Sequence, residues 1–318
     1  MSKPELLLIG GATDVMLERM SAEFTLHKLR NINDLDAWAA EHGAKIEALA
    51  TNGHDGVPSR IMEACPNLKV ASAYGVGYDA IDTDACVARG IKVSHTPNVL
   101  NAEVANTVLM LLLAGFRNLL ADEHHARSGE WESSGNAPLS RSPDGRVVGV
   151  LGMGRIGQEI AERLGVFGSE ILYHTRSKKD LPYEYCDDLV AMAERSDVLV
   201  CITPGGPATE KLVNKQVLEA LGPDGMLINV ARGSVVDEAA LIEALQSGKL
   251  GSAGLDVFEK EPHIPNALKE MDNVVLLPHV GSATVETRAA MGKLTVDNLL
   301  QWKQDGSVLT PVPECAHL

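Results

Sequence analysis

Cysteine is sparse in this chain, and its distribution excludes two kinds of structure. The five cysteines are odd in number and scattered, and no two form a C-x-x-C pair; they are Cys65, Cys86, Cys186, Cys201 and Cys315. This pattern argues against a disulfide framework and a structural zinc site, and it fits a reducing cytosol. We therefore expect a cytoplasmic protein without a metal centre, in which most cysteines are small core residues.

Positive charge is also in short supply. The chain has 28 lysine and arginine residues against 43 aspartate and glutamate residues, which gives a formal net charge of −15. Such a surface repels phosphate backbones and anionic membranes, so neither nucleic acid nor a membrane is expected as a partner. A small anionic substrate is compatible with this charge if one local arginine meets it.

Long hydrophobic runs are absent as well. The longest apolar stretch, residues 108–115, is far shorter than the roughly 20 residues of a membrane span and predicts a buried helix. The apolar run near the N-terminus is too short for a signal peptide. With 318 residues, 45% of them hydrophobic, the chain can build about two domains of roughly 150 residues each.

Short apolar runs alternate with helical segments through both halves of the chain. Helices are expected at 14–20, 59–64, 101–120 and 284–306, the third capped by Asn101, and the tail 309–318 is expected to be extended. Strands are expected at 5–9, 25–29, 46–50, 68–72, 92–94, 147–151, 170–174, 198–202, 226–230, 252–257 and 274–277. A Ser-, Pro- and Gly-rich connector at 133–145 separates two α/β units, each predicted to contain a doubly wound parallel sheet.

The strongest single motif is a glycine-rich turn between a predicted strand and a predicted helix. Residues 152–157 read GMGRIG, which is the G-x-G-x-x-G pattern of dinucleotide-binding folds. Gly152 makes the tight turn, Gly154 lets the backbone approach a pyrophosphate at the helix N-terminus, and Gly157 lets helix and strand pack closely. Arg155 is expected to face the pyrophosphate. The alternative interpretation is an ordinary tight loop.

The residues after the next strand indicate which cofactor is used. NAD-specific folds carry an acidic residue about 20 positions after the glycines, to bind the ribose 2′-hydroxyl. Here that position reads Thr175, Arg176, Ser177 and Lys178, with no acid. Arg176 can pair with a 2′-phosphate, Ser177 can donate to it and Lys178 adds positive charge. We therefore expect NADPH to be preferred and NAD(H) to bind more weakly; a solvated basic turn is the alternative.

Several motifs together resemble the D-isomer-specific 2-hydroxyacid dehydrogenase family. They lie at residues 74–79, 96–100, 152–157, 228–233, 254–258, 261–262 and 277–282. The run 273–288 is most similar to the glyoxylate/hydroxypyruvate reductase branch, which includes hydroxyphenylpyruvate reductases. The resemblance implies a flavodoxin-like substrate-binding domain (1–98, completed by 285–318), a Rossmann domain (99–284), an active-site cleft between them, and a homodimer.

Three residues form the predicted catalytic set. His279 is the natural proton donor, because the ordinary pKa of an imidazole lies near neutrality and because it follows a strand at the carboxyl edge of the sheet. Glu261 would accept a hydrogen bond from the other ring nitrogen and stabilise the imidazolium. Arg232, also after a strand, offers a planar fork to the substrate carboxylate and keto oxygen.

Further site residues come from the resemblance alone. It gives Val76 and Gly77 a role in binding the substrate carboxylate through backbone amides, and Gly75 would bare its amide in the same turn. Leu100 is assigned to the substrate pocket, with core packing as the alternative, since both fit an apolar side chain. Asp256 would orient the nicotinamide carboxamide; the remaining implied cofactor contacts are Ile156, Thr203, Val230 and Gly281.

The function predicted from these residues is NADPH-dependent reduction of small 2-keto acids, with glyoxylate and hydroxypyruvate foremost. A second class is a dinucleotide-sensing scaffold protein, which would tolerate loss of the arginine, glutamate and histidine that are all present here. Within the enzymes, phosphoglycerate dehydrogenase and hydroxyphenylpyruvate reductase are the alternatives. The basic residues at 176–179 and the short tail argue against the former.

Overall fold

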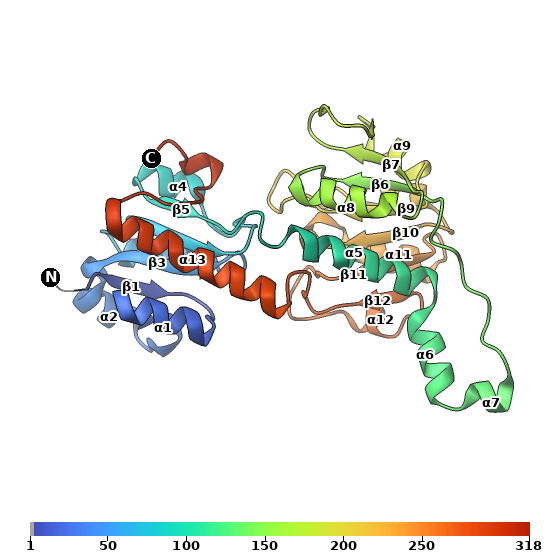
Figure 1. Ribbon diagram of the computed structural model, residues 1–318, viewed down its shortest axis with the longest axis horizontal. Helices are drawn as coiled ribbons and strands as arrows, with labels where there is room; N and C mark the ends of the chain where they lie inside the picture. Colours follow the sequence, from blue (N-terminus) through green and yellow to red (C-terminus); the bar gives the residue numbers. More distant parts are fainter. Residues whose placement is uncertain (1–2) are drawn as a thin grey trace. The chain divides into compact units, whose positions relative to one another are not determined.

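The computed structural model describes residues 3–318, which form two compact units. Unit 1 contains the described residues up to Leu100 together with Thr284–Leu318, and unit 2 is Asn101–Ala283. Each unit is a parallel β-sheet with helices packed on both of its faces (Figure 1). The chain therefore has the α/β fold with two doubly wound sheets that the alternation of strands and helices predicted.

The sheet of unit 1 has five strands in the order β2-β1-β3-β4-β5, all parallel. This is the flavodoxin-like order. The strands are β1 (Glu5–Leu8), β2 (Thr25–Lys28), β3 (Ile46–Asn52), β4 (Val70–Tyr74) and β5 (Lys92–Ser94). The helices are α1 (Asp14–Glu23), α2 (Leu35–His42), α3 (Ser59–Ala64), α4 (Thr83–Ala88) and α13 (Val285–Asp305).

Alternating side chains of these strands feed two separate cores. Leu6 and Leu8 of β1 pack with α1 and α13 on one face, whereas Leu7 and the following Ile9 pack with α3 and α4 on the other. A strand turns successive side chains to opposite faces, so one apolar run serves both layers. Helix α13 thus covers one face of the sheet formed by the first hundred residues, although it comes from the far end of the chain (Figure 1).

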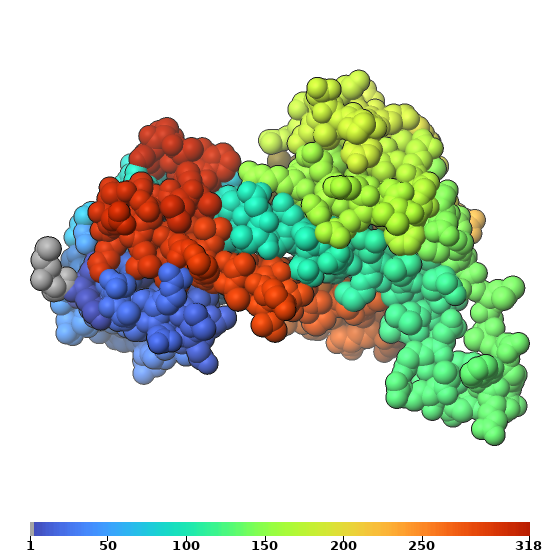
Figure 2. All heavy atoms as spheres, viewed as in Figure 1, coloured from blue at the N-terminus to red at the C-terminus, as the bar shows by residue number. Residues whose placement is uncertain are grey.

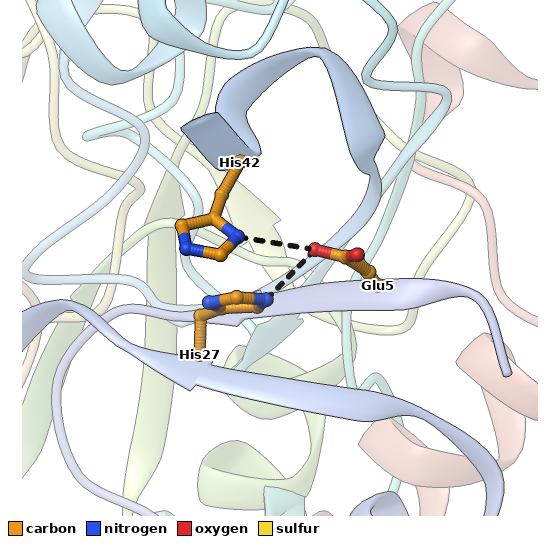
Figure 3. A group of neighbouring side chains, drawn as sticks. All are labelled: Glu5, His27 and His42. Atoms are coloured by element: carbon orange, nitrogen blue, oxygen red, sulfur yellow. Dashed lines mark hydrogen bonds and ion pairs between the residues drawn. The ribbon is translucent and has the colours of Figure 1, made fainter. Parts of the chain in front are cut away.

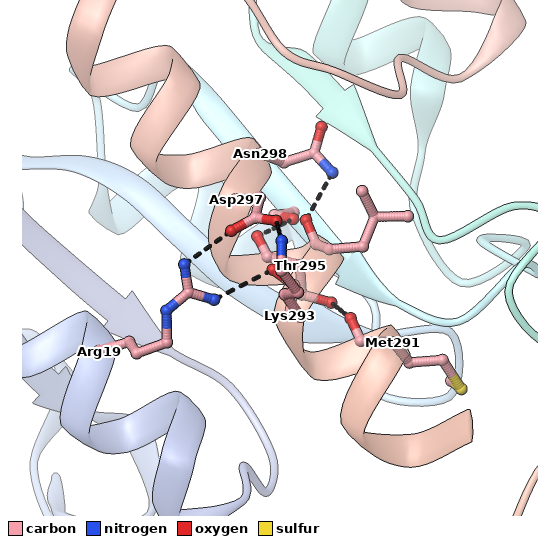
Figure 4. A network of polar contacts seen from close by, with 8 residues as sticks. Arg19, Met291, Lys293, Thr295, Asp297 and Asn298 are labelled. Carbon is pink, nitrogen blue, oxygen red and sulfur yellow. Dashed lines mark hydrogen bonds and ion pairs between the residues drawn. The ribbon is translucent and has the colours of Figure 1, made fainter. Parts of the chain in front are cut away.

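A polar network joins α13 to α1 within unit 1 (Figure 4). Arg19 of α1 donates to Asp297 of α13 at 2.7 Å, and Lys293, one helical turn earlier, donates to the same carboxylate at 2.6 Å. The hydroxyl of Ser72 in β4 donates to the carbonyl oxygen of Thr295 at 2.9 Å. The first of these bonds fixes α13 to α1 and the last fixes it to the sheet.

The sheet of unit 2 has seven parallel strands in the order β12-β11-β10-β9-β6-β7-β8. Read from β8, this is the Rossmann order with one additional strand. The strands are β6 (Val147–Leu151), β7 (Glu170–His174), β8 (Glu184–Tyr185), β9 (Val198–Cys201), β10 (Met226–Asn229), β11 (Ser252–Leu255) and β12 (Val274–Leu276). The two-residue strand β8 was not predicted.

Helices cover both faces of the sheet of unit 2. On one face α5 (Asn101–Phe116) packs beside α8 (Arg155–Gly165), and glycines let α5 approach closely: a Cβ on Gly115 would lie 2.5 Å from Met226, and one on Gly254 would lie 3.0 Å from Leu111. The other helices of this unit are α6 (Leu119–Arg127), α7 (Glu130–Ser134), α9 (Leu189–Glu194), α10 (Lys215–Leu221), α11 (Glu238–Gln246) and α12 (Asn266–Lys269).

Two expectations about helix and tail were wrong. The helix predicted over 101–120 ends at Phe116, because Asn118 adopts a left-handed conformation (φ 50°) and α6 starts in a new direction. The tail is not extended throughout: Val312 donates to Val93 at 2.9 Å, and a short 3-10 helix, Pro313–Cys315, then buries Cys315 in the core of unit 1.

Among the described residues, no single helix is long and apolar enough to cross a membrane. Helices α5 and α6 reach the required length and composition only as a pair that is bent by 61°. Helix α5 has eight buried residues in unit 2, which accounts for its apolar sequence as core packing.

Candidate active site

Three neighbouring strands of unit 2 carry the predicted catalytic residues. Arg232 follows β10, Glu261 follows β11 and His279 follows β12, and these strands lie side by side and parallel. Parallel strands end at the same edge of a sheet, where α/β folds bind their ligands. The fold thus gathers residues 232, 261 and 279 on one edge.

His279 and Glu261 are in direct contact. Nδ1 of His279 lies 2.7 Å from Oε2 of Glu261, and Oε1 of Glu261 accepts a hydrogen bond from the Phe258 amide at 3.1 Å. The histidine side chain is 47% exposed and the glutamate 20%. A carboxylate at Nδ1 fixes the orientation of the ring and leaves Nε2 to exchange a proton with a bound molecule.

The backbone around His279 is held in an uncommon conformation by Asp256. His279 has φ 54°, in the left-handed region. Its amide donates to the Asp256 carbonyl oxygen at 2.9 Å, and the two carboxylate oxygens of Asp256 accept the amides of Val280 (2.7 Å) and Gly281 (2.8 Å). Asp256 therefore binds three consecutive residues of the loop that presents the imidazole.

Asp256 is itself buried, with 2% of its surface exposed. Burial raises the pKa of its carboxyl above the usual range, and the hydrogen bonds from the Val280 and Gly281 amides oppose that rise. Both carboxylate oxygens of Asp256 are thus engaged in ordering the His279 loop.

The loop of Arg232 is packed against the loop of Glu261. A Cβ on Gly233 would lie 2.0 Å from the carbonyl of Phe258, so only glycine allows this approach of two backbones. Asn229, at the end of β10, accepts from the Ala231 amide and donates to the Arg232 carbonyl, both at 3.1 Å. Arg232 is half-buried, and its Nη1 donates to the Ala231 carbonyl at 2.8 Å.

The glycine turn fits a dinucleotide pyrophosphate. Gly152 has φ 105°, and a Cβ there would lie 2.8 Å from the amide nitrogen of Thr203, while a Cβ on Gly157 would lie 2.1 Å from the carbonyl oxygen of Gly152. Gly154, by contrast, faces open space. A side chain would be excluded from the first and third positions by protein atoms, whereas the second leaves room for a group from outside.

The N-terminus of α8 adds the electrostatic part of this fit. Gly154 caps the helix without a side-chain hydrogen bond, and the amides at the start of a helix favour the binding of an anion. Arg155, in the first turn, is exposed and Ile156 is half-buried. Beside this turn, Thr203 after β9 is half-buried and Val230 after β10 is buried. Thr203 and Val230 thus lie at the same edge of the sheet as the glycine turn.

The predicted 2′-phosphate residues follow β7, next to the glycine turn. The Gly152 amide donates to the His174 carbonyl at 3.0 Å, and the Thr175 hydroxyl donates to the Ser177 carbonyl at 2.7 Å. The tip of the turn that follows β7 has three exposed side chains, none of them acidic: Arg176, Ser177 and Lys178. The tip can therefore accept an anion.

The predicted carboxylate-binding turn lies in unit 1, after β4. The amides of Val76 and Gly77 donate no hydrogen bond within residues 3–318, so they can serve an anion. The Gly75 amide is different, because it donates to the Thr96 hydroxyl at 3.1 Å; the expectation that it would be bare was wrong. Leu100, which ends the first of the two segments of unit 1, is buried.

One residue that contacts this turn, His95, was not predicted from the sequence. Nδ1 of His95 lies 2.9 Å from the carbonyl oxygen of Val76, which can only accept, so the His95 ring donates. His95 is 8% exposed and follows β5. Only its place directly before the Thr96-Pro97 pair could have drawn attention to it.

Glu5, His27 and His42 form a second cluster of polar side chains, in unit 1 (Figure 3). Their nearest nitrogen and oxygen atoms lie within 4.8 Å of one another, and Nε2 of His27 is 2.8 Å from Glu5. The Trp38 indole N–H, which can only donate, lies 3.3 Å from Nδ1 of His27. The neutral ring therefore carries its proton on Nε2 and has no lone pair there for a metal ion. We interpret the cluster as a hydrogen-bonded structural group.

A comparison with known families identifies the family of this chain. Residues 109–281 match the family model for the D-isomer specific 2-hydroxyacid dehydrogenase, NAD binding domain. The chain belongs to this dehydrogenase family. This result confirms the family predicted from the motifs, and with it the Rossmann fold of unit 2 in this 2-hydroxyacid dehydrogenase.

Relatives of this dehydrogenase span its whole length. A 2-ketogluconate reductase of Gluconobacter oxydans is 43% identical over 98% of this chain and 99% of its own. Glyoxylate/hydroxypyruvate reductase A HPR2 of Arabidopsis thaliana is 44% identical over 85% and 87%. The crystal structure of an NADPH-dependent glyoxylate/hydroxypyruvate reductase from Sinorhizobium meliloti, in complex with NADP and malonate, superposes with a TM-score of 0.93 at 46% identity, covering 99% of this chain and 98% of that one.

Proposed function

We propose that this dehydrogenase reduces small 2-keto acids, glyoxylate and hydroxypyruvate foremost, with NADPH. The observation that carries the proposal is the 2.7 Å contact between His279 and Glu261 on the sheet edge that also bears Arg232. A cation for the carboxylate and an acid with a carboxylate partner are what the reduction of a 2-keto acid requires of a protein.

The protein's part in the reaction is to bind the carboxylate and supply a proton. The nicotinamide cofactor, when bound, supplies the hydride. Arg232 pairs with the substrate carboxylate and keto oxygen, which also polarises the carbonyl group. His279 gives its Nε2 proton to the carbonyl oxygen as negative charge develops there, and Glu261 stabilises the imidazolium before the transfer. In the oxidative direction His279 takes the same proton back.

We assign dinucleotide binding to unit 2, and substrate-carboxylate binding to Arg232 of unit 2 and to the turn after β4 in unit 1. Gly152, Gly154 and the first-turn amides of α8 hold the pyrophosphate, and Arg176 pairs with the 2′-phosphate. The amides of Val76 and Gly77 bind the carboxylate. An NADPH preference agrees with the Sinorhizobium meliloti enzyme, whose structure contains NADP. Asp256, Thr203, Val230 and Gly281 remain assigned to the nicotinamide half.

A second substrate deserves a direct comparison. The Gluconobacter oxydans relative, similar over its whole length, is a 2-ketogluconate reductase. Its substrate shares the 2-keto carboxylate that Arg232 and His279 would bind, and differs in the polyol tail. Leu100 and the residues after β4 would decide between a short and a long tail.

We further propose a homodimer formed through unit 2. Among the described residues, six of the ten exposed large hydrophobic side chains lie between positions 110 and 139: Met110, Leu113, Leu119, Leu120, Trp131 and Leu139. They occur on α5, on α6 and α7, and on the segment that follows, and α6 and α7 stand away from the sheet of unit 2 (Figures 1 and 2). An exposed apolar surface of this kind is typical of an interface between subunits.

The test is a substrate panel with both cofactors. Oxidation of NADPH and of NADH is followed with glyoxylate, hydroxypyruvate, 2-ketogluconate and hydroxyphenylpyruvate. We expect the highest kcat/KM with NADPH and either glyoxylate or hydroxypyruvate. A higher kcat/KM with 2-ketogluconate would replace the substrate while keeping the chemistry. Absence of turnover with every acid would favour a dinucleotide-sensing scaffold and overturn the proposal.

A further inference from the structure

The turn that carries Arg176 and Ser177 is tied down by a buried tyrosine. Tyr173, in β7, is fully buried, yet its hydroxyl is not left without partners. It donates to the carbonyl oxygen of Lys179 at 3.0 Å and accepts from the Lys179 amide at 2.9 Å. One side chain therefore satisfies both main-chain groups of the residue at which the turn ends.

A second tyrosine holds the start of the same turn. Tyr185 pairs with Tyr173 in register across the parallel strands β7 and β8, and their ring centroids are 5.4 Å apart. The Tyr185 hydroxyl donates to the carbonyl oxygen of Thr175 at 3.2 Å. Strand β8 is only two residues long, and it places Tyr185 at the start of the turn. We call the two hydrogen bonds between the Tyr173 hydroxyl and the backbone of Lys179, at the end of the turn, the clamp.

Packing alone does not explain the Tyr173 hydroxyl. A phenylalanine would fill the same volume without bringing a polar atom into the core, and burying a hydroxyl costs free energy unless it is hydrogen-bonded. Both hydrogen bonds of this hydroxyl go to the backbone of one exposed residue in an irregular turn. Their effect is to restrict the conformations of the three residues between the two tyrosine contacts.

We propose that Tyr173, assisted by Tyr185, is a positioning residue that sets the preference of this enzyme for NADPH. The inference rests on the proposed contact of Arg176 and Ser177 with the 2′-phosphate. With residues 175 and 179 both held, the guanidinium and the hydroxyl are presented in one arrangement, and binding of the 2′-phosphate does not have to order the turn.

The decisive variant is Tyr173→Phe, which removes the hydroxyl and keeps the ring. Binding is measured by calorimetry with two fragments that need no turnover, adenosine 2′,5′-bisphosphate and ADP. We expect the Kd for adenosine 2′,5′-bisphosphate to rise about tenfold and the Kd for ADP to stay within about twofold. In steady state, the KM for NADPH should rise in the same proportion while kcat and the KM for NADH stay unchanged.

Two further variants serve as a second test and as a control. Tyr185→Phe loses one hydrogen bond to the turn and should show the same selective loss at about threefold, which serves if Tyr173→Phe does not fold. Tyr183→Phe is the matched control, because the Tyr183 hydroxyl makes no hydrogen bond within the described residues and lies just before β8. It should bind both fragments like the wild type.

The outcomes distinguish a failure of the role inferred for Tyr173 from a failure of the proposed NADPH preference. If the wild type binds ADP as tightly as adenosine 2′,5′-bisphosphate, the NADPH preference is wrong. If the wild type prefers the 2′-phosphate, but Tyr173→Phe weakens both fragments equally or neither of them, Tyr173 only supports the fold and our inference is overturned. A selective loss of 2′-phosphate binding supports it.

Discussion

The main-chain amide of His279 donates to the carbonyl oxygen of Asp256 at 2.9 Å, and the side chain of Asp256 binds the two amides that follow. The histidine is thereby kept at φ 54°, a conformation that costs free energy for a residue with a side chain. Asp256 is buried, and its carboxyl accepts these bonds although burial disfavours its charge. His279 and Asp256 therefore act together: the loop of His279 has a strained conformation, and the carboxylate of Asp256 maintains it.

The first prediction concerns Asp256→Asn. The Val280 and Gly281 amides donate to different oxygens of Asp256, and in the variant one of these oxygens becomes an NH₂ group, which cannot accept the hydrogen bond. We expect kcat with hydroxypyruvate to fall at least about tenfold, and the free energy of unfolding to fall by about 1–3 kcal/mol. Steady-state kinetics and denaturant unfolding measure the two effects. An unchanged kcat would mean that the loop does not need this carboxylate.

The second prediction concerns ionic strength. Arg176→Ala should raise the KM for NADPH at least about tenfold, since an ion pair with the 2′-phosphate is lost, and leave the KM for NADH unchanged. In the wild type, added salt should weaken NADPH binding more than NADH binding, and the variant should lose that difference. Arg30→Ala removes one exposed charge in unit 1 and is the control. Equal salt sensitivity of both cofactors would count against Arg176.

The third prediction concerns stability and pH. Burial opposes ionisation of Asp297, but the hydrogen bonds from Lys293 and Arg19 outweigh it, and its pKa lies below 3.8. A lowered pKa stabilises the fold above the unfolded-state value and loses this contribution as the pH falls through the folded-state value. At neutral pH, Asp297→Asn should therefore lower the free energy of unfolding by about 1–2 kcal/mol.

This difference should begin to shrink as the pH falls below the ordinary aspartate pKa, because the unfolded chain then takes up the proton, and it should vanish below the lowered folded-state pKa, where Asp297 is protonated in both states. Glu18→Gln is the control, since Glu18 is an exposed acid on the same helix as Arg19. A deficit for Asp297→Asn that stays constant with pH would show that packing, and not charge, accounts for the contact of α13 with α1.

The fourth prediction concerns the oligomeric state. Trp131 is 63% exposed on α7 and Leu120 is 59% exposed on α6. The double variant Leu120→Glu/Trp131→Glu would bury two charges in the proposed interface and should convert the dimer to a monomer in light scattering coupled to size exclusion. Val166→Glu changes an exposed apolar residue outside this segment and should leave the mass unchanged. A wild-type monomer would reject the proposed dimer directly.

Strand and helix positions were largely predictable, because buried parallel strands are short apolar runs separated by helices. The exceptions have local causes. The left-handed Asn118 breaks a helix that its apolar pattern would continue, and β8 has only two residues, Glu184 and Tyr185, so it leaves no periodic signal. The buried end of the tail depends on Cys315 meeting the core of unit 1, which no local pattern encodes.

The identity of the catalytic side chains in the candidate site could be predicted from the sequence. The contacts that hold the surrounding turns could not. Arg232, Glu261 and His279 each follow a strand, so their common edge could be inferred from the sequence. The hydrogen bond from His95 to Val76 and the clamp of Tyr173 on Lys179 join a side chain to a backbone group in an irregular turn. Such bonds depend on turn conformations that composition and periodicity do not specify.

The most direct test of the central claim is the effect of His279→Ala on turnover and on cofactor binding. NADPH oxidation with hydroxypyruvate is measured in steady state, and the Kd for NADPH is measured in the absence of keto acid. We predict a loss of at least about a hundredfold in kcat with an unchanged Kd, because only the proton donor is removed. A variant that keeps the wild-type kcat would contradict the assignment of His279 as the acid.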